Sequence, residues 1–493
     1  MIAITLNAQA ADEQATGKLW MEAKEGAVFP AKVTYANDAG ELGIVNQSGD
    51  IPIDGHPFFE PQGDAGRACV TCHQPADAMS LSVDSIQARW ELTKGADPLF
   101  HPFDGANCPD QPRGEPSSHS LLLERGLIRI GLPWPPLDKD GNEIEPEFTI
   151  EVVNDPTGCN TSPVYGLTSD HPTVSVFRRP RMSANLRYMT TSFSLSGRFN
   201  GKTGLPLAID PDTGQRVGLP IMADARASNL RGQAQDALAG HMRLSEPLTD
   251  EELDEIIAFE SQIYAAQESH ILGGNFTEEG SPPALGPMAL VNGESIVGGF
   301  NWRSPVFFNF DAWRDPPGQT QEQRDFRASV ARGYDIFFER PMWIRDVAWF
   351  NSIGMGNPYK RSCAICHSVH LTGSDISPGL MDLGVNNLKL ALGTNSPDLP
   401  VFKVTCKDDA LPHPYLGREF ETYDPGRALI TGKCQDIGSL VMQQLRGLSA
   451  RAPYFSNGSA ETLRDVVDYY DERFVMEMTE QEKQDLTNFL SVL

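Results

Sequence analysis

The chain has 493 residues, of which 66 are acidic and 40 are basic, so its formal net charge at pH 7 is −26. This negative charge argues against a nucleic-acid-binding protein. It favours a basic or neutral protein partner, and it fits a simple solubilising surface equally well. Hydrophobic residues make up 40% of the chain, as in ordinary globular proteins, and no apolar run is long enough to cross a membrane. The length predicts two or three domains.

The first residues form a short apolar run that ends in Ala8-Gln9-Ala10, a pattern typical of signal-peptide cleavage. No basic segment precedes this run. We therefore interpret residues 1–10 as the remnant of an export signal whose start lies upstream. Export would place the protein in the periplasm.

The pattern Cys-x-x-Cys-His occurs twice, almost three hundred residues apart. Two thiols on one turn suit attachment to the two vinyl groups of a haem, and the adjacent His suits iron ligation. A redox-active thiol pair would not need the His, and a zinc site would need further ligands close in sequence. The sequence therefore predicts two covalently bound c-type haems, whose attachment and iron-binding residues are Cys69, Cys72, His73, Cys363, Cys366 and His367. Because haem c attachment is completed outside the cytoplasm, this prediction agrees with export.

A polar, Pro-rich excursion runs from about residue 98 to residue 172, and its "SLLLERGLIRIGLPWPP" predicts a short helix followed by a strand. Loops of this length are usually functional or cross-linked. The four Cys outside the haem motifs are even in number, as disulfides in an oxidising compartment require. Three connectivities are possible, with four free thiols as the alternative. We choose Cys108–Cys159 and Cys406–Cys434, because each pair then stays within one predicted domain.

An acidic amphipathic helix is predicted downstream of each haem motif, at 248–267 and at 478–493. Each begins with a capping box, in which a Thr is followed three residues later by Glu. The two segments align without a gap, with Phe259 on Phe489. We therefore predict a mainly α protein of two tandem c-type cytochrome domains with long irregular loops. The predicted parts are a first domain at 11–275 with a disulfide-stapled insertion at about 98–172, a linker at 276–295 and a second domain at 296–493.

With those parts placed, the sequence resembles the bacterial di-haem cytochrome c peroxidase family. That family includes the enzyme that matures the tryptophan-derived cofactor of methylamine dehydrogenase. The matching pieces span nearly the whole chain in family order: "HPFFEPQGDAGRACVTCH", "RRPRMSANL", "SLSGR", "LRGQAQDALAGHM", "RGYDIFF" and "LRGLSARAPYFSNGSAETLRDVVDYYDERF". The insertion at 98–172 is additional, so the resemblance is to an atypical, longer member.

The resemblance implies that the N-terminal haem reacts with peroxide and that the C-terminal haem passes electrons to it. Cleavage of the O–O bond needs an open or labile sixth iron position and a distal group that moves a proton. The alignment places His171 at the labile distal His of the family and Gln233 at its distal Gln. The acidic proton-transfer residue is missing, and His241 lies nearby as a substitute. The alternative for both His residues is an ordinary surface side chain.

Other positions depart from the family pattern. Leu195 stands where the Trp between the haems is expected, and Arg179 replaces the calcium-contacting Asn, so calcium binding is uncertain. At the C-terminal haem, the register places Tyr470 at the sixth ligand position, as in the maturation enzyme. Met476 and Met478 are rival ligands, and the alternative for Tyr470 is a core aromatic on a helical stripe.

The resemblance favours a periplasmic di-haem oxidoreductase of the cytochrome c peroxidase kind. Its partners would be hydrogen peroxide or another small oxidant and a small electron-donor protein, either a cytochrome c or a cupredoxin. Two alternatives stay open. One is an electron-transfer cytochrome without peroxide chemistry. The other is a maturation-type or oxygenase-type enzyme that acts on a protein or organic substrate.

Overall fold

The computed structural model describes residues 20–138, 140–190, 221–227, 229–293, 309–348, 356–368, 372–373, 380–389 and 396–493. Its helices are α2 (Cys69–Cys72), α3 (Val83–Thr93), α4 (Ser120–Arg125), α5 (Leu186–Thr190), α6 (Leu230–His241), α7 (Asp250–Glu260), α8 (Pro287–Asn292), α9 (Gln321–Glu339), α10 (Ala428–Thr431), α11 (Leu463–Phe474) and α12 (Glu480–Ser491). Its strands are β1 (Val28–Phe29), β2 (Lys32–Asn37), β3 (Gly40–Asn46), β4 (Ile51–Pro52), β5 (Ile128–Pro133), β6 (Phe148–Asn154), β7 (Thr173–Arg178), β8 (Ile263–His270), β9 (Gly274–Asn275), β10 (Met342–Ile344), β11 (Tyr359–Arg361), β12 (Leu380–Met381), β13 (Val401–Cys406), β14 (Glu419–Thr422) and β15 (Leu440–Val441).

The fold is mixed α/β, and the mainly α architecture predicted from the sequence is wrong. Within the described ranges, the strands form sheets of two to four members, the largest in the order β2-β3-β8-β9. Most strands are short, and several pair with strands far away in the chain, as β3 does with β8. A short strand shows little alternation of apolar and polar residues. Pairing with a strand far away in the chain cannot be recognised from the local sequence, so only the helical patterns support a prediction.

The helix predicted at 248–267 ends early. The capping box of Thr249 and Glu252 starts α7 as expected, but the helix stops at Glu260. Residues Ile263–His270 then form strand β8, in which Tyr264 is fully buried. Antiparallel pairing with β3 satisfies the backbone of this apolar run, so tertiary pairing overrides the helical spacing.

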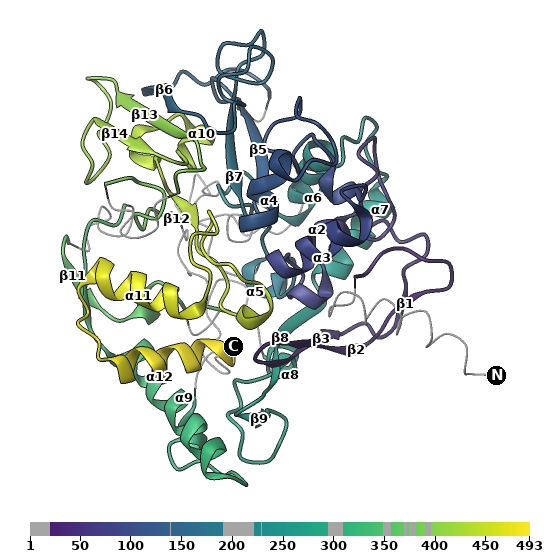
Figure 1. The fold of residues 1–493 in the computed structure, drawn as a ribbon, viewed down its shortest axis with the longest axis vertical. Helices are drawn as coiled ribbons and strands as arrows, with labels where there is room; N and C mark the ends of the chain where they lie inside the picture. The colour runs from purple at the N-terminus through teal and green to yellow at the C-terminus, as the bar shows by residue number, and fades with distance from the viewer. Residues whose placement is uncertain are drawn as a thin grey trace, which may run out of the picture.

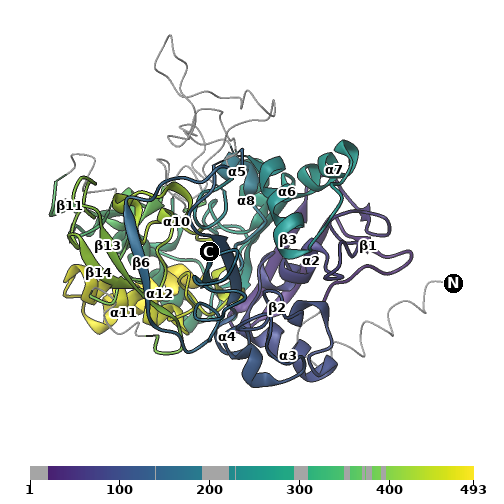
Figure 2. The same cartoon turned by 90° about the horizontal axis from the view of Figure 1, so that it is seen from above.

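The predicted insertion contributes to a sheet with the C-terminal half. The segment "SLLLERGLIRIGLPWPP" forms helix α4 and strand β5, as predicted. Strand β6, further along the same insertion, pairs antiparallel with β13, which in turn pairs with β14. Figures 1 and 2 both show blue β6 beside green β13 and β14, and Figure 1 shows the purple-to-teal N-terminal half lying beside the green-to-yellow C-terminal half.

The predicted C-terminal helix forms as α12, with Thr479 and Glu482 in its capping box. It packs against α9, the helix that precedes the second haem motif. Gly333 of α9 lies so close to the backbone of Asp485 that a β-carbon would collide with it. The Asp485 carboxylate accepts a hydrogen bond from Ser329 at 2.5 Å, so side-chain contacts also hold the two helices together.

Each half has its own apolar core. Phe259 of α7 belongs to an aromatic group with Phe29, Phe58 and Phe59 in the N-terminal half. Its aligned counterpart Phe489 is fully buried in the C-terminal core. The segment at 276–295, predicted as an irregular linker, contains the short helix α8, whose Leu290 is fully buried.

The structure joins Cys108 to Cys159 and Cys406 to Cys434, which is the pairing chosen from the sequence. In the described part of the chain, no helix is both long enough and apolar enough to span a bilayer. The predicted signal remnant at 1–10 and Leu195 lie outside the described residues.

Candidate functional site

The first Cys-x-x-Cys-His motif lies on the wall of a cavity. Cys69 and Cys72 are the first and last residues of the single-turn helix α2, and His73 follows at once. All three side chains line the cavity. Apolar residues of β5, α5, α6 and α7 also line the cavity: Ile128, Ile130, Leu186, Met189, Ala234, Ala237, Leu238 and Ile256.

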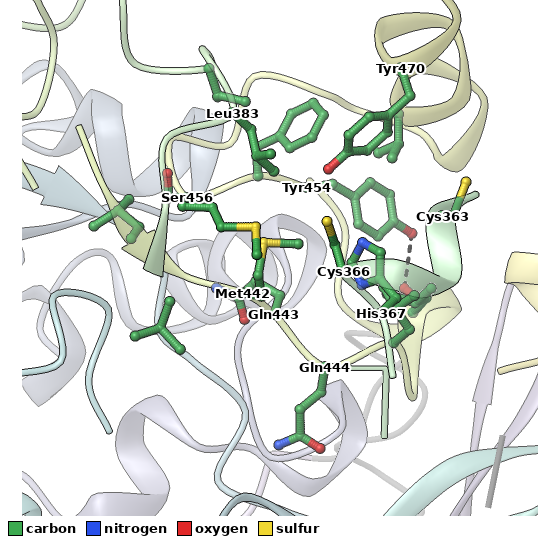
Figure 3. A pocket seen from close by; sticks show the side chains of 18 of the residues that line it. Cys363, Cys366, His367, Leu383, Met442, Gln443, Gln444, Tyr454, Ser456 and Tyr470 are labelled. Carbon is green, nitrogen blue, oxygen red and sulfur yellow. Dashed lines mark hydrogen bonds between the residues drawn. The ribbon is translucent and has the colours of Figure 1, made fainter. Parts of the chain in front are cut away.

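The second motif lies in the same way on a second cavity. Cys363 begins a short 3-10 turn, and Cys366 and His367 follow it. The cavity is lined mainly by apolar side chains from the C-terminal half, and Tyr470 enters it from α11. Figure 3 shows the Tyr470 hydroxyl directed into the cavity, above the side of the wall formed by Cys366 and His367.

Both motif His residues are fixed in the same tautomer. His73 Nδ1 lies 3.0 Å from the carbonyl oxygen of Met79, and His367 Nδ1 lies 2.6 Å from that of Gly373. A carbonyl can only accept, so each Nδ1 carries the hydrogen and each Nε2 keeps its lone pair. Burial lowers the pKa of both imidazoles, to about 4 in His367, so both are neutral at pH 7. A neutral imidazole with a free Nε2 is the form that binds a metal.

Gln233 and His241 lie on the face of α6 that lines the first cavity. His241 Nδ1 is 2.7 Å from Oδ2 of the buried Asp104, whose other oxygen is ion-paired with the buried Arg67. Burial alone would raise the pKa of Asp104, but the Arg67 guanidinium and His241 hold it below its usual value. The ionised Asp104 accepts the Nδ1 hydrogen, so Nε2 of His241 is left to exchange a proton.

His171 is not brought to this site. It is exposed on the turn before β7 and lines neither of the two cavities. Asp104 and Arg67, which do support the site, were missed by sequence reasoning. A lone Asp in an insertion and an Arg before a haem motif carry no recognisable pattern, because their role depends on contacts across the fold.

Tyr470, predicted as an iron ligand, and its predicted rival Met476 both line the second cavity, whereas Met478 is buried outside it. Burial raises the pKa of Tyr470 well above its usual value, so the hydroxyl is neutral. Met381 and Met442 also line the cavity and were not predicted. Figure 3 shows Met442 reaching into the same space.

One wall separates the two cavities. The segment 178–181, Ala223 and the pair Gln443 and Gln444 line both of them. Hydrogen bonds tie the wall together: Gln444 Nε2 donates to the carbonyl of Ala184 at 3.0 Å, and Arg181 donates to two carbonyls of the facing strand region. Two groups bound in these cavities would therefore be neighbours across a single layer of protein.

The first cavity also contains a buried acid, Glu260, at the end of α7. It is 4% exposed, and its Oε2 has no hydrogen-bond partner in the described part of the chain. Burial raises the pKa of Glu260 from 4.5 to about 8, so the carboxyl group is protonated at pH 7. The resemblance did not point to this residue.

The residues fit two c-type haems. Each cavity offers two thiols and one His nitrogen from a single short turn, with apolar walls for a porphyrin. Over the described ranges, no group of three or more His, Cys, Asp or Glu side chains is placed to hold a metal ion, so neither motif is part of such a cluster.

Calcium fits less well. Arg179, at the position expected for a calcium-contacting Asn, donates hydrogen bonds to the backbone carbonyls of Leu81, Arg125 and Arg451. These carbonyl oxygens therefore already bind the Arg179 guanidinium and are not free to bind calcium.

Neither a protein-family model nor a curated protein sequence matches the chain. Among solved structures, a hydrazine synthase of Kuenenia stuttgartiensis pressurised with xenon is 16% identical, with a TM-score of 0.29, covering 84% of this chain and 93% of its own. A MauG-like protein associated with microbial copper homeostasis is 17% identical, with a TM-score of 0.28, covering 63% of this chain and 82% of its own. Similarity at this level does not establish a shared fold.

Proposed function

We propose that this protein is a periplasmic di-haem c-type oxidoreductase that reduces a peroxide at the N-terminal haem with electrons supplied through the C-terminal haem. The observation that carries the proposal is the pair of cavities, each with its own Cys-x-x-Cys-His motif, that share one wall. Short separation through a single layer suits electron transfer between the two bound groups.

The haem, when bound, supplies the redox-active iron. His73 would hold it through Nε2, and Cys69 and Cys72 would attach the porphyrin covalently. The net reaction consumes one hydrogen peroxide, two electrons and two protons and releases two water molecules. The electrons would come from a small donor protein, either a cytochrome c or a cupredoxin.

Side chains of α6 would carry out the proton transfer. Nε2 of His241 can take a proton from one peroxide oxygen and return it to the other, because Asp104 fixes Nδ1 as the protonated nitrogen. Gln233 lies two turns earlier on the same face of the helix and offers an amide that can orient the peroxide. A positioned acid–base group of this kind typically contributes about 10²–10⁴-fold to the rate.

The experiment is peroxide consumption by the fully loaded protein, followed together with the haem spectra. His241→Ala and Gln233→Ala should each lower turnover at least about tenfold while both haems stay attached. His171→Ala, which alters an exposed His outside both cavities, is the matched control and should leave turnover unchanged. A wild-type protein that reacts with peroxide in no redox state would exclude the peroxidase function and leave the electron carrier in its place.

One observation favours a second candidate, an enzyme that oxidises a protein or organic substrate. Tyr470 points its hydroxyl into the second cavity, and the resemblance associates a Tyr at this position with the maturation branch of the family. Both candidates use the same two haems. They are distinguished by whether the oxidised protein is reduced faster by a donor cytochrome or by an added organic substrate.

A further inference from the structure

Besides Arg178, three arginines lie at or beside the wall between the two cavities. Arg179 and Arg181 line both cavities, and Arg451 lines the second. Arg179 is 8% exposed and Arg451 is 9% exposed, while Arg181 is half-buried. Three positive charges are thus gathered in the interior of a protein whose net charge is −26.

In the described ranges, their hydrogen-bond acceptors are all neutral backbone carbonyls. Arg181 donates to Val441 at 2.9 Å and to Met442 at 3.0 Å. Arg451 donates to the carbonyls of Gln444 and Arg446, and Arg179 to those of Leu81, Arg125 and Arg451. A guanidinium has five N–H donors, so each of the three retains donors beyond these bonds.

Among the residues that the structure describes, no carboxylate forms an ion pair with any of the three. The contrast is with Arg178, which lines the same wall but is ion-paired with Asp224 and Asp424 at 2.6 Å each. Asp224 and Asp424 form ion pairs with Arg178 but not with these three neighbours, although Asp77 and Asp224 favour the charged forms of Arg179 and Arg181 without direct contact.

Buried like charges without counter-ions are costly, because each loses its hydration and repels the others. Burial, followed by the Arg451 guanidinium, lowers the pKa of both Arg179 and Arg181. Anions that enter the two cavities would remove this cost. Each haem carries two propionate carboxylates, so two haems would bring four negative charges into the two cavities that these arginines line.

We propose that Arg179, Arg181 and Arg451 bind the propionate carboxylates of the two haems, and that this shared arginine cluster raises the reduction potential of both. The inference rests on the proposed function only for the presence of haem. Cations beside a haem stabilise the reduced form, which has one positive charge less than the oxidised form. Because Arg181 lines both cavities, its charge should act on both potentials.

The test is a spectroelectrochemical titration of the loaded protein. Arg181→Gln should lower both potentials, and Arg451→Gln should lower mainly that of the C-terminal haem. Arg181→Lys keeps the positive charge, so both reduction potentials should stay close to those of the wild type. Arg427→Gln is the matched control: Arg427 is half-buried and donates to two backbone carbonyls, but it lines neither cavity. Its potentials should equal those of the wild type.

Unchanged potentials in both Gln variants, with both haems attached, would overturn the proposal. Should a Gln variant fail to fold, the propionate bending bands in the resonance Raman spectrum serve instead. These bands should differ between wild type and Arg181→Lys, and identical bands would also overturn it. Haem content and peroxide turnover are measured separately, so a failure of the proposed function is distinguishable from a failure of this inference.

Discussion

Asp104 and His241 are joined by a hydrogen bond of 2.7 Å between Oδ2 and Nδ1, although 137 residues separate them in the sequence. Asp104 belongs to the predicted insertion, and His241 is the last residue of α6. An extra segment of the chain therefore fixes the orientation of the His that faces the first cavity. The insertion is in this way linked to the chemistry proposed for that cavity.

Replacement of this acid should impair turnover without removing haem. In Asp104→Asn the negative charge that holds His241 Nδ1–H is lost, so peroxide turnover should fall at least about tenfold. Steady-state kinetics at equal haem content measures the effect. Asp97→Asn is the control, since Asp97 is also a buried carboxylate paired with an arginine, Arg89, but accepts its hydrogen bonds from Arg89 and Leu99, which line neither cavity. Equal turnover in the two variants would show that Asp104 has no role in the reaction.

Tyr470 and its neighbour Tyr469 provide a matched pair for the second cavity. Tyr470 lines the cavity, whereas the hydroxyl of Tyr469 donates to the carbonyl of Leu383 at 2.9 Å and Tyr469 does not line it. An axial ligand tunes the iron that it binds, so Tyr470→Phe should change the spectrum and potential of the C-terminal haem alone. Tyr469→Phe should leave both unchanged. If Tyr470→Phe is spectroscopically silent, a Met in the same cavity is the better ligand candidate.

Glu260 predicts a pH dependence of stability. Its pKa is raised by burial from 4.5 to about 8, so the folded protein keeps a proton that the unfolded chain has already released. Below the unfolded pKa of Glu260 the carboxyl group is neutral in both states, and its burial does not lower the free energy of unfolding. As the pH rises from there towards the folded pKa, the unfolded chain ionises while the folded protein does not, so the free energy of unfolding falls. Glu260→Gln cannot ionise, so its Tm should exceed that of wild type by an amount that grows between about pH 5 and pH 8. Calorimetry measures this, with Glu251→Gln as the exposed control on the same helix. A constant difference in Tm would contradict the prediction.

Local patterns were sufficient to predict some of this structure. Capping boxes located the starts of α7 and α12, because a cap depends on residues three apart. The insertion helix α4 and strand β5 were likewise visible in the sequence. Haem attachment was predicted from the two Cys-x-x-Cys-His motifs because each motif supplies all of the attachment chemistry, and each motif lies on the wall of a cavity.

Apart from the two disulfides, contacts between residues far apart in the sequence could not be predicted. The pairing of β6 with β13 and the bond between Asp104 and His241 join segments with no shared pattern. The predicted end of α7 is wrong because Tyr264 continues the helical spacing of apolar residues. In the structure Tyr264 belongs to strand β8, which pairs with β3. His171 was placed by alignment register alone, and register across a long insertion does not determine which side chains reach a cavity.

Calcium should have no effect on the wild-type protein. The Arg179 guanidinium donates to the carbonyls of Arg125 at 3.2 Å and Arg451 at 2.9 Å, and also to that of Leu81, so these oxygens have no room for a second cation. The Tm should be the same in calcium and in a chelator. Arg179→Asn frees the carbonyls and adds an amide oxygen, which are ligands that calcium accepts, so calcium should raise the Tm of this variant. A wild-type protein destabilised by the chelator would refute this reading of Arg179.

The most direct test of the di-haem assignment is the intact mass of the denatured wild-type protein after expression in a host that attaches haem c. Denaturation removes every group that is not covalently bound, so any remaining haem must be held by the Cys residues of the motifs. Covalent attachment at both motifs predicts a mass equal to the polypeptide plus two haems. A mass that corresponds to one haem or to none would contradict it.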